Sequence, residues 1–282
     1  MCNDSSEGHA SWSRNRLKEK VSMIFETHAH YDDEKFDSDR VELLSHLVEQ
    51  NVNKVVNIGA SITSSKKSIK LAEQYDYIYA SIGVHPEEVQ DMTENDIEWL
   101  TQNAVNKKVV AIGEIGLDYY WEKDEKNRER QIYWFKRQLK VAHLVDLPVV
   151  IHSRDACDDT LFTLREYTRC SVPGIIHCFS YSPEIARQYI DMGWYIGVGG
   201  VVTFKNGKKL VETVKNIPLE KIVIETDAPY MAPEPYRGQR NTSVYLNEVA
   251  EKIAQIKGIT KEEVEEVTYN NALNIYSKVK VN

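Results

Sequence analysis

Two histidines, His28 and His30, stand two positions apart in the segment FETHAHY at residues 25–31. In a β-strand the side-chain period is two, so both imidazoles emerge on one face and point at the same object. In one interpretation that object is a metal ion. In the other, the two rings are simply solvated or form a hydrogen-bonded pair. The segment alone leaves both interpretations open, and the rest of the chain must supply the partners.

Polar side chains of the same kinds recur where later apolar runs end. They are His85, Glu114, His152, His177 and Asp227. The other histidines, His9, His46 and His143, lie in the N-terminal segment or in predicted helices. Packed strand ends cannot leave charges unpaired, so the convergence of these side chains on one mouth favours a metal site over unrelated structural residues.

The expected ligands are four imidazoles and two carboxylates. They are His28, His30, His152, His177, Glu114 and Asp227. This mixture suits Zn²⁺ or Mn²⁺, and Mg²⁺ if waters complete its shell. Six ligands favour two ions over one, because a catalytic zinc takes three protein ligands. Glu114, on a middle strand, is the expected bridge, and Asp227 can reach the ion held by His28 and His30. Two ions that hold a hydroxide between them indicate a hydrolase.

The elements that must position these residues alternate strictly. Short β-rich runs are expected at residues 23–30, 52–61, 77–85, 108–118, 147–153, 174–180, 194–200 and 221–229. Segments of helical period separate them, such as residues 128–146, and a final helix at residues 261–278 is expected to pack against the outside. This alternation over about 260 residues predicts an α/β fold, a (β/α)8 TIM barrel, with its chemistry at the carboxyl ends of the strands.

The composition narrows the class of protein. Of 282 residues, 42% are hydrophobic and 28% charged, which is typical of a globular enzyme with a sizeable core. The formal charge of −8 argues against a protein that holds nucleic acid mainly through a basic surface. Four cysteines without CxxC spacing, and no apolar run of membrane-spanning length, predict a cytoplasmic protein. Residues 1–22 are expected to be a poorly ordered leader, or to precede the true start at Met23, with one domain at 23–282.

Basic residues cluster in the loops that follow the later strands. They are Arg154, Lys205, Arg237 and Arg240. Barrels commonly bind phosphate after strands 7 and 8, and two metal ions favour an anionic oxygen, so a phosphate ester is the expected substrate. The aromatic run DYYW at residues 118–121 either stacks nucleobases or covers the barrel end. Cys178, beside His177, is a further candidate ligand, but alternation is expected to turn it to the opposite face, away from the site.

Taken together, these motifs resemble the TatD family of metal-dependent deoxyribonucleases, within the amidohydrolase-like barrels. The matching segments are THAH, GVHP, GEIGLDYY, PVVIHSRDA, HCFSYS, YIGVGGVVTFK and ETDAPYMAPEPYRGQRN. The resemblance implies hydrolysis of DNA with Mg²⁺ as the usual activator. It also implies two ligand sets, which are His28, His30, Glu114 and Asp227 for one ion and Glu114, His152 and His177 for the other. The chain departs from the family at Glu26, where aspartate is commoner, and at Ala29, where cysteine is common.

The resemblance also implies exonuclease action on single strands. With it, the sequence predicts a two-metal deoxyribonuclease that acts as a 3′–5′ exonuclease on single-stranded DNA, uses a metal-bound hydroxide and needs no obligate protein partner. Asp227 and Glu114 are the expected catalytic residues, with Asp227 as proton acceptor. The residues expected to position phosphate oxygens are His85, Arg154, Lys205 and Arg240. One rival is a hydrolase of a carbon-centred ester or amide, such as an aminoacyl-tRNA deacylase, because the same hydroxide can attack a carbonyl. The other is a metal-binding interaction protein without turnover.

Overall fold

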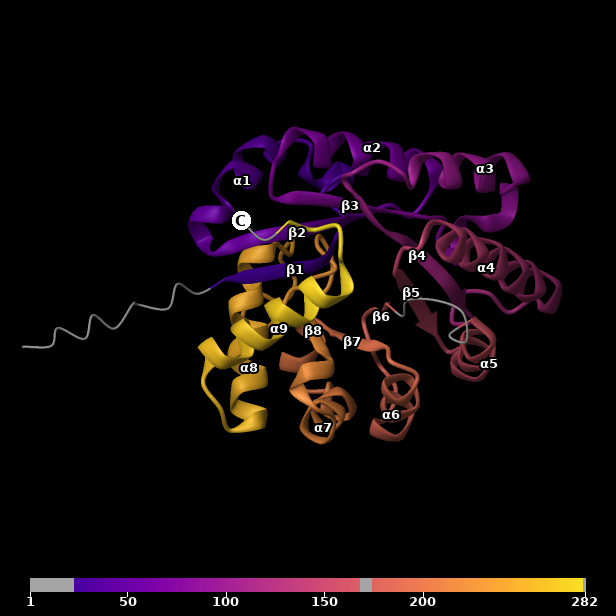
Figure 1. Cartoon of the computed structure of the whole chain (residues 1–282). Helices are drawn as coiled ribbons and strands as arrows, with labels where there is room; N and C mark the ends of the chain where they lie inside the picture. The colour runs from indigo at the N-terminus through magenta and orange to yellow at the C-terminus, as the bar shows by residue number, and fades with distance from the viewer. Residues whose placement is uncertain (1–22, 168–173, 281–282) are drawn as a thin grey trace, which may run out of the picture.

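The computed structural model describes residues 23–167 and 174–280, and there eight parallel strands form one sheet in the order β1 to β8 (Figure 1). The strands are β1 (Ile24–Ala29), β2 (Val52–Ile58), β3 (Ile78–Ile82), β4 (Val109–Asp118), β5 (Val149–Arg154), β6 (Ile175–Ile176), β7 (Tyr195–Val198) and β8 (Ile222–Ile224). A parallel bridge between Ala29 and Ala228 joins the end of β1 to the segment after β8. The (β/α)8 barrel predicted from the sequence is confirmed.

Helices follow the strands along the chain, and all of those described except the last form the outer layer (Figure 1). They are α1 (Arg40–His46), α2 (Ile62–Gln74), α3 (Glu94–Asn103), α4 (Glu125–Val145), α5 (Cys157–Tyr167), α6 (Pro183–Asp191), α7 (Lys208–Asn216), α8 (Leu246–Lys257) and α9 (Lys261–Ile275). Short 3-10 helices lie in the connections: η1 (Glu34–Phe36), η2 (Val48–Gln50), η3 (Pro86–Asp91), η4 (Gly200–Thr203), η5 (Leu219–Lys221) and η6 (Ser243–Tyr245). Several helices begin at a side chain that accepts a backbone N–H of the first turn, as Ser61, Asp124 and Thr260 do.

The strands lie where the sequence predicts them, but several end earlier. Because β6 stops at Ile176 and β8 at Ile224, His177 and Asp227 follow their strands instead of lying on them. The backbone at Cys178 and Asp227 has φ of 44° and 59°, in the left-handed region that no strand residue adopts. The candidate ligands His177 and Asp227 therefore lie on turns at the mouth of the barrel.

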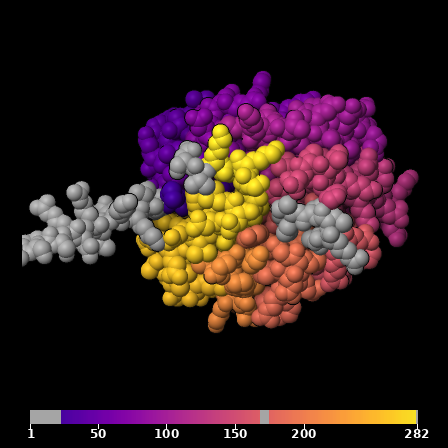
Figure 2. All heavy atoms as spheres, in the orientation of Figure 1, coloured from indigo at the N-terminus to yellow at the C-terminus, as the bar shows by residue number. Residues whose placement is uncertain are grey.

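Helix α9 closes the end of the barrel at which the strands begin. One buried cluster combines residues of β1 to β6 and β8 with residues of α9, namely Phe25, Val56, Tyr79, Val110, Val150, Ile175 and Val223 with Tyr269, Ala272, Ile275 and Tyr276. Side chains from strands all around a barrel meet only in its interior. The expectation that this helix packs on the outside is wrong, because its apolar side chains fill the barrel end. In Figures 1 and 2 it lies across the middle of the face shown.

No helix within residues 23–167 and 174–280 is both long and apolar enough to cross a membrane. The leader expected at residues 1–22 lies outside the described residues. In the described part of the chain, Cys157 and Cys178 are free thiols.

Candidate metal centre

His28 and His30 point at the same place, as their spacing predicts. Their Nε2 atoms are 3.2 Å apart, and Glu114 Oε2 lies 3.3 Å from the first and 3.8 Å from the second. Asp227 Oδ1 lies 3.4 Å from His30 Nε2 and 3.8 Å from His28 Nε2. Four ligand atoms at about 2.0–2.1 Å from one tetrahedral ion are about 3.3 Å apart, so this donor set fits a single divalent ion.

Two neighbouring groups fix the orientation of this donor set. His30 Nδ1 lies 3.0 Å from the carbonyl oxygen of Ile58, which directs Nε2 into the centre. Glu26 Oε1 accepts the backbone N–H groups of His28 at 3.1 Å and of Thr226 at 2.9 Å, and its Oε2 accepts the Thr226 hydroxyl at 2.6 Å. This buried carboxyl therefore joins β1 to the segment that carries Asp227.

The other carboxylate oxygen of Glu114 faces a second group of histidines. Oε1 lies 2.9 Å from His152 Nδ1 and 3.8 Å from His177 Nε2, while Oε2 faces His28 and His30. The carboxylate thus lies between the two predicted ligand sets, where a bridge between two ions has to be.

His85 also enters this second group, although the sequence places it with the phosphate-binding residues. Ligand atoms of His85, Glu114 and His152 all lie within 4.8 Å of one another. However, His85 Nδ1 accepts the backbone N–H of Glu87 at 3.3 Å. Burial and then the nearby His152 lower the pKa of His85 to about 3, so the ring is neutral and its proton is on Nε2. His85 therefore presents a hydrogen-bond donor to the centre and not a lone pair.

Asp118 and Glu225 are functional candidates that the sequence analysis missed. Asp118 Oδ2 lies 2.9 Å from His152 Nε2, and Glu225 Oε1 lies 3.0 Å from His177 Nδ1. A Cβ on Gly197 would lie 2.5 Å from Glu225 Oε2, so glycine at this position leaves room for the carboxylate inside the barrel. The period of two gave no signal for Glu225, because β8 ends at Ile224 and the period holds only within a strand.

The carboxylates make the centre favourable for positive charge. Burial lowers the pKa of His30, but the hydrogen bond and charge of Asp227 and the charge of Glu114 outweigh it and raise that pKa to about 9. The pKa of His177 also rises to about 9, because Glu225 and Glu114 outweigh its burial. In turn, the buried histidines hold the pKa values of Glu114 and Asp227 below their usual range despite burial. Protons or metal ions supply the positive charge that this arrangement requires.

Comparisons with known proteins identify the family of this chain. A family model described as "TatD related DNase" matches residues 25–277. The chain belongs to the TatD family. Similar proteins include the uncharacterized metal-dependent hydrolase YabD of Bacillus subtilis, which is 42% identical over 90% of this chain and 99% of the relative. Another is the uncharacterized metal-dependent hydrolase YcfH of Escherichia coli K12, 33% identical over 90% of this chain and 96% of the relative.

A solved TatD homologue has the same fold. The crystal structure of YjjV from Escherichia coli K12 matches with a TM-score of 0.85 and 30% identity over 91% of this chain and 99% of that chain. With this membership, the chain is a metal-dependent hydrolase, and the fitting donor sets are its candidate metal centre.

Beside the centre of this TatD-family chain, three side chains form what we call the aromatic–arginine surface: Tyr120, Trp121 and Arg154. The Arg154 guanidinium lies 3.8 Å from the ring centre of Tyr120 and 5.7 Å from that of Trp121. Asp118 Oδ1 accepts the backbone N–H groups of Tyr120 at 2.9 Å and Trp121 at 3.0 Å, which ties this surface to the metal centre. Trp121 is 63% exposed, so the surface can receive a ligand.

The two other predicted phosphate-binding residues differ in their surroundings. Lys205 is exposed in the connection between η4 and α7. Arg240 instead forms an ion pair with Asp39, with Nη1 donating to Oδ1 at 2.8 Å, and its guanidinium lies 4.6 Å from the ring centre of Phe36. The side chain predicted to hold phosphate thus already has an anionic partner of its own.

Cys178 does not face away from the site, and that expectation is wrong. Its left-handed backbone ends the alternation on which the expectation depended, and its N–H donates to Glu225 Oε1 at 2.6 Å. The thiol therefore lies on the side of His177.

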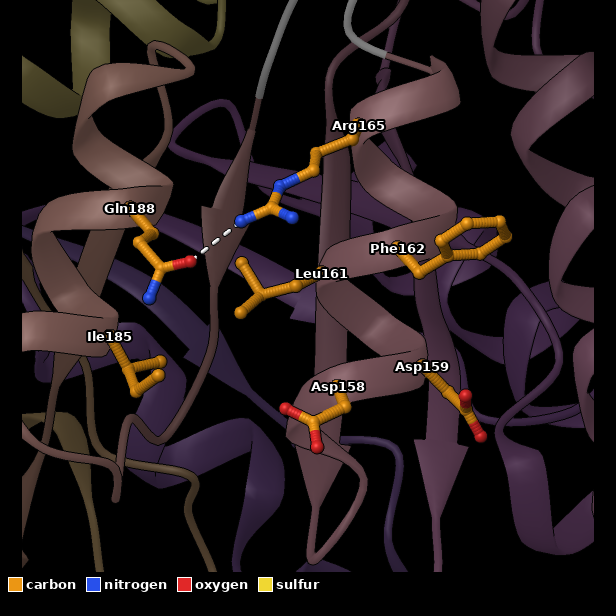
Figure 3. Close-up of a pocket in the computed structure, with 7 residues that line it drawn as sticks. All are labelled: Asp158, Asp159, Leu161, Phe162, Arg165, Ile185 and Gln188. Carbon is orange, nitrogen blue, oxygen red and sulfur yellow. Dashed lines mark hydrogen bonds between the residues drawn. The ribbon is translucent and has the colours of Figure 1, made fainter.

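A separate hollow of about 400 Å³ lies on the outer layer between α5 and α6 (Figure 3). It is lined by Asp158, Asp159, Leu161, Phe162, Arg165, Ile185 and Gln188. Arg165 Nη2 donates to Gln188 Oε1 at 2.6 Å across it. None of the site residues predicted from the sequence lines this hollow. Its acidic and basic side chains therefore serve as controls for those of the metal centre.

Proposed function

We propose that this metal-dependent hydrolase cleaves phosphodiester bonds of DNA, as a 3′–5′ exonuclease that prefers single strands. The expected cofactors are two divalent ions, Mg²⁺, Mn²⁺ or Zn²⁺. The first ion would be held by His28, His30, Glu114 and Asp227, and the second by Glu114, His152 and His177. The observation that carries the proposal is that the two oxygens of Glu114 face the two histidine groups separately. Ions bound there would supply Lewis acidity, a water of lowered pKa and compensation for charge that develops on phosphate oxygens.

The residues around the ions have separate roles in this proposal. Asp227 is ionised at neutral pH, because the neighbouring histidines lower its pKa. While its Oδ1 faces the first ion site, its other carboxylate oxygen can accept a proton from the attacking water. Glu114 fixes the distance between the two histidine groups. His85 Nε2 donates to a phosphate oxygen, and the guanidinium of Arg154 offers paired donors to the same group.

A single-stranded substrate is supported by the aromatic–arginine surface. Exposed aromatic rings stack unpaired bases, which contributes about 1–3 kcal/mol per base, whereas paired bases in a duplex present no free face. The net charge of −8 argues against binding of duplex DNA mainly through a broad basic surface. Recognition then depends on these few side chains, with Lys205 as a further cationic contact. Arg240 could join them only by leaving Asp39. We also propose a cytoplasmic location, because the free thiols of Cys157 and Cys178 are typical of proteins in a reducing compartment.

The direct test removes metal with a chelator, restores one divalent ion at a time and follows cleavage of single-stranded DNA. A 5′ label gives a progressively shortened ladder if the enzyme acts from the 3′ end. Asp227→Asn is expected to abolish cleavage, whereas Asp158→Asn, in the hollow between α5 and α6, keeps it. Failure to cleave DNA with any ion, together with hydrolysis of an aminoacyl-tRNA ester by the same preparation, would contradict the nuclease proposal.

A further inference from the structure

The thiol of Cys178 is part of a mixed donor group at the metal centre. Its Sγ, a ring nitrogen of His177 and a carboxylate oxygen of Asp227 all lie within 4.8 Å of one another. Asp227 also belongs to the group of His28 and His30, so the thiol borders the place where the first ion fits. Among the described cysteines, Cys157 on α5 belongs to no such group.

The backbone holds the thiol in this place. Cys178 follows the end of β6 in a left-handed conformation with φ of 44°, which a side chain other than glycine adopts at a cost. The hydrogen bond from its N–H to Glu225 Oε1, at 2.6 Å, stabilises this turn. The same carboxylate lies 3.0 Å from His177 Nδ1, so Glu225 orients two members of the donor group together.

We propose that Cys178 is a ligand for a thiophilic divalent ion, such as Zn²⁺ or Cd²⁺, together with His177 and Asp227. Soft thiolate sulfur selects such ions, whereas Mg²⁺ takes oxygen ligands and keeps several waters. On binding, the S–H bond breaks, a sulfur–metal bond forms, and the proton leaves to the solvent. The inference rests on the proposed function in taking His177 and Asp227 as metal ligands, and the thiophilic ion takes one ligand from each of the two ligand sets. A thiolate ligand makes the preference of the centre for Zn²⁺ over Mg²⁺ stronger than imidazoles and carboxylates alone would make it.

A spectroscopic experiment tests this proposal without any substrate. Metal-free protein is titrated with Cd²⁺, and the thiolate-to-cadmium charge-transfer absorption in the ultraviolet is recorded. A sole-thiol variant with Cys2→Ser, Cys157→Ser and Cys170→Ser is expected to keep the band, and Cys178→Ser to lose it. The Zn²⁺ dissociation constant of Cys178→Ser is expected to rise by about tenfold or more, as when a partner is removed from a metal site. A band of full strength in Cys178→Ser would overturn the proposal.

A second measurement on the unmodified chain covers the case in which a variant fails to fold. Each cysteine is alkylated in excess Zn²⁺ or excess Mg²⁺, and the labelled peptides are quantified by mass spectrometry. Zn²⁺ is expected to slow the labelling of Cys178 and not that of Cys157, and Mg²⁺ to protect neither. Equal labelling of Cys178 with both ions would refute the assignment. Protection by Zn²⁺ in a protein that does not cleave DNA would keep this inference while the nuclease proposal fails.

Discussion

Asp118 Oδ2 lies 2.9 Å from His152 Nε2, on the opposite side of the imidazole from Glu114 Oε1, which lies 2.9 Å from Nδ1. The ring is thus held between two carboxylates. Because Asp118 Oδ1 also accepts the N–H groups of Tyr120 and Trp121, one buried carboxylate orients both a candidate metal ligand and the aromatic–arginine surface. A carboxylate that fixes a ligating histidine tunes the metal that the histidine binds.

Replacing Asp118 by asparagine keeps the shape of the side chain and removes its charge. We expect Asp118→Asn to weaken metal affinity or turnover by about 10–100-fold, since outer partners of ligating histidines typically contribute this much. The pKa of His152, which Asp118 and Glu114 raise to about 9 against burial, should fall in the metal-free variant. Metal competition with a chelator and NMR titration of His152 measure the two effects. Asp158→Asn is the matched control, and equal metal affinity in both variants would rule out this role.

The aromatic–arginine surface leads to a prediction about substrate binding. Arg154→Gln should raise KM for single-stranded DNA more than it lowers kcat, because in the proposed complex the guanidinium binds phosphate oxygens and does not supply the attacking group. The slope of log affinity against log salt should become shallower by about 0.7, the value for one phosphate contact on a single strand. Trp121→Ala should weaken binding by about 1–3 kcal/mol, the range for one stacked base. Arg165→Gln, in the hollow between α5 and α6, should change neither quantity; a similar loss there would mean that the effect is not local.

The sequence predicts the barrel and much of the centre because both depend on local periods. The spacing of His28 and His30 works because β1 runs through Ala29, whereas Cys178 escapes prediction because β6 ends at Ile176. Once a strand ends, the period of two carries no information about direction. Pairs that are distant in the sequence cannot be predicted from local periods either. Asp39 and Arg240 are an example, because only the folded chain brings them together.

The ion pair of Arg240 with Asp39 separates a structural role from a substrate role. Both side chains are partly exposed, so their coupling free energy should be about 0.2–1 kcal/mol in a double-mutant cycle with Arg240→Gln and Asp39→Asn. Urea unfolding of the four proteins measures this coupling. If Arg240 only stabilises the loop, KM for DNA stays within twofold in Asp39→Asn. A lower KM in Asp39→Asn, which frees the guanidinium, would instead show that Arg240 binds substrate.

Glu26 makes stability depend on pH. Burial raises its pKa from 4.5 to about 7, outweighing the hydrogen bonds from Thr226 and His28, so the folded protein favours the protonated carboxyl. The stabilisation is complete below pH 4.5 and is lost as the pH rises through about 7. The side chain in Glu26→Gln is neutral at every pH. When the pH rises from 4.5 to 8, the free energy of unfolding of the wild type should therefore fall by about 3 kcal/mol more than that of this variant. Urea unfolding at each pH measures this change, and a chelator in the buffer removes bound cations, whose charge would alter the titration of Glu26. Parallel pH profiles for the two proteins would mean that Glu26 does not titrate in this range.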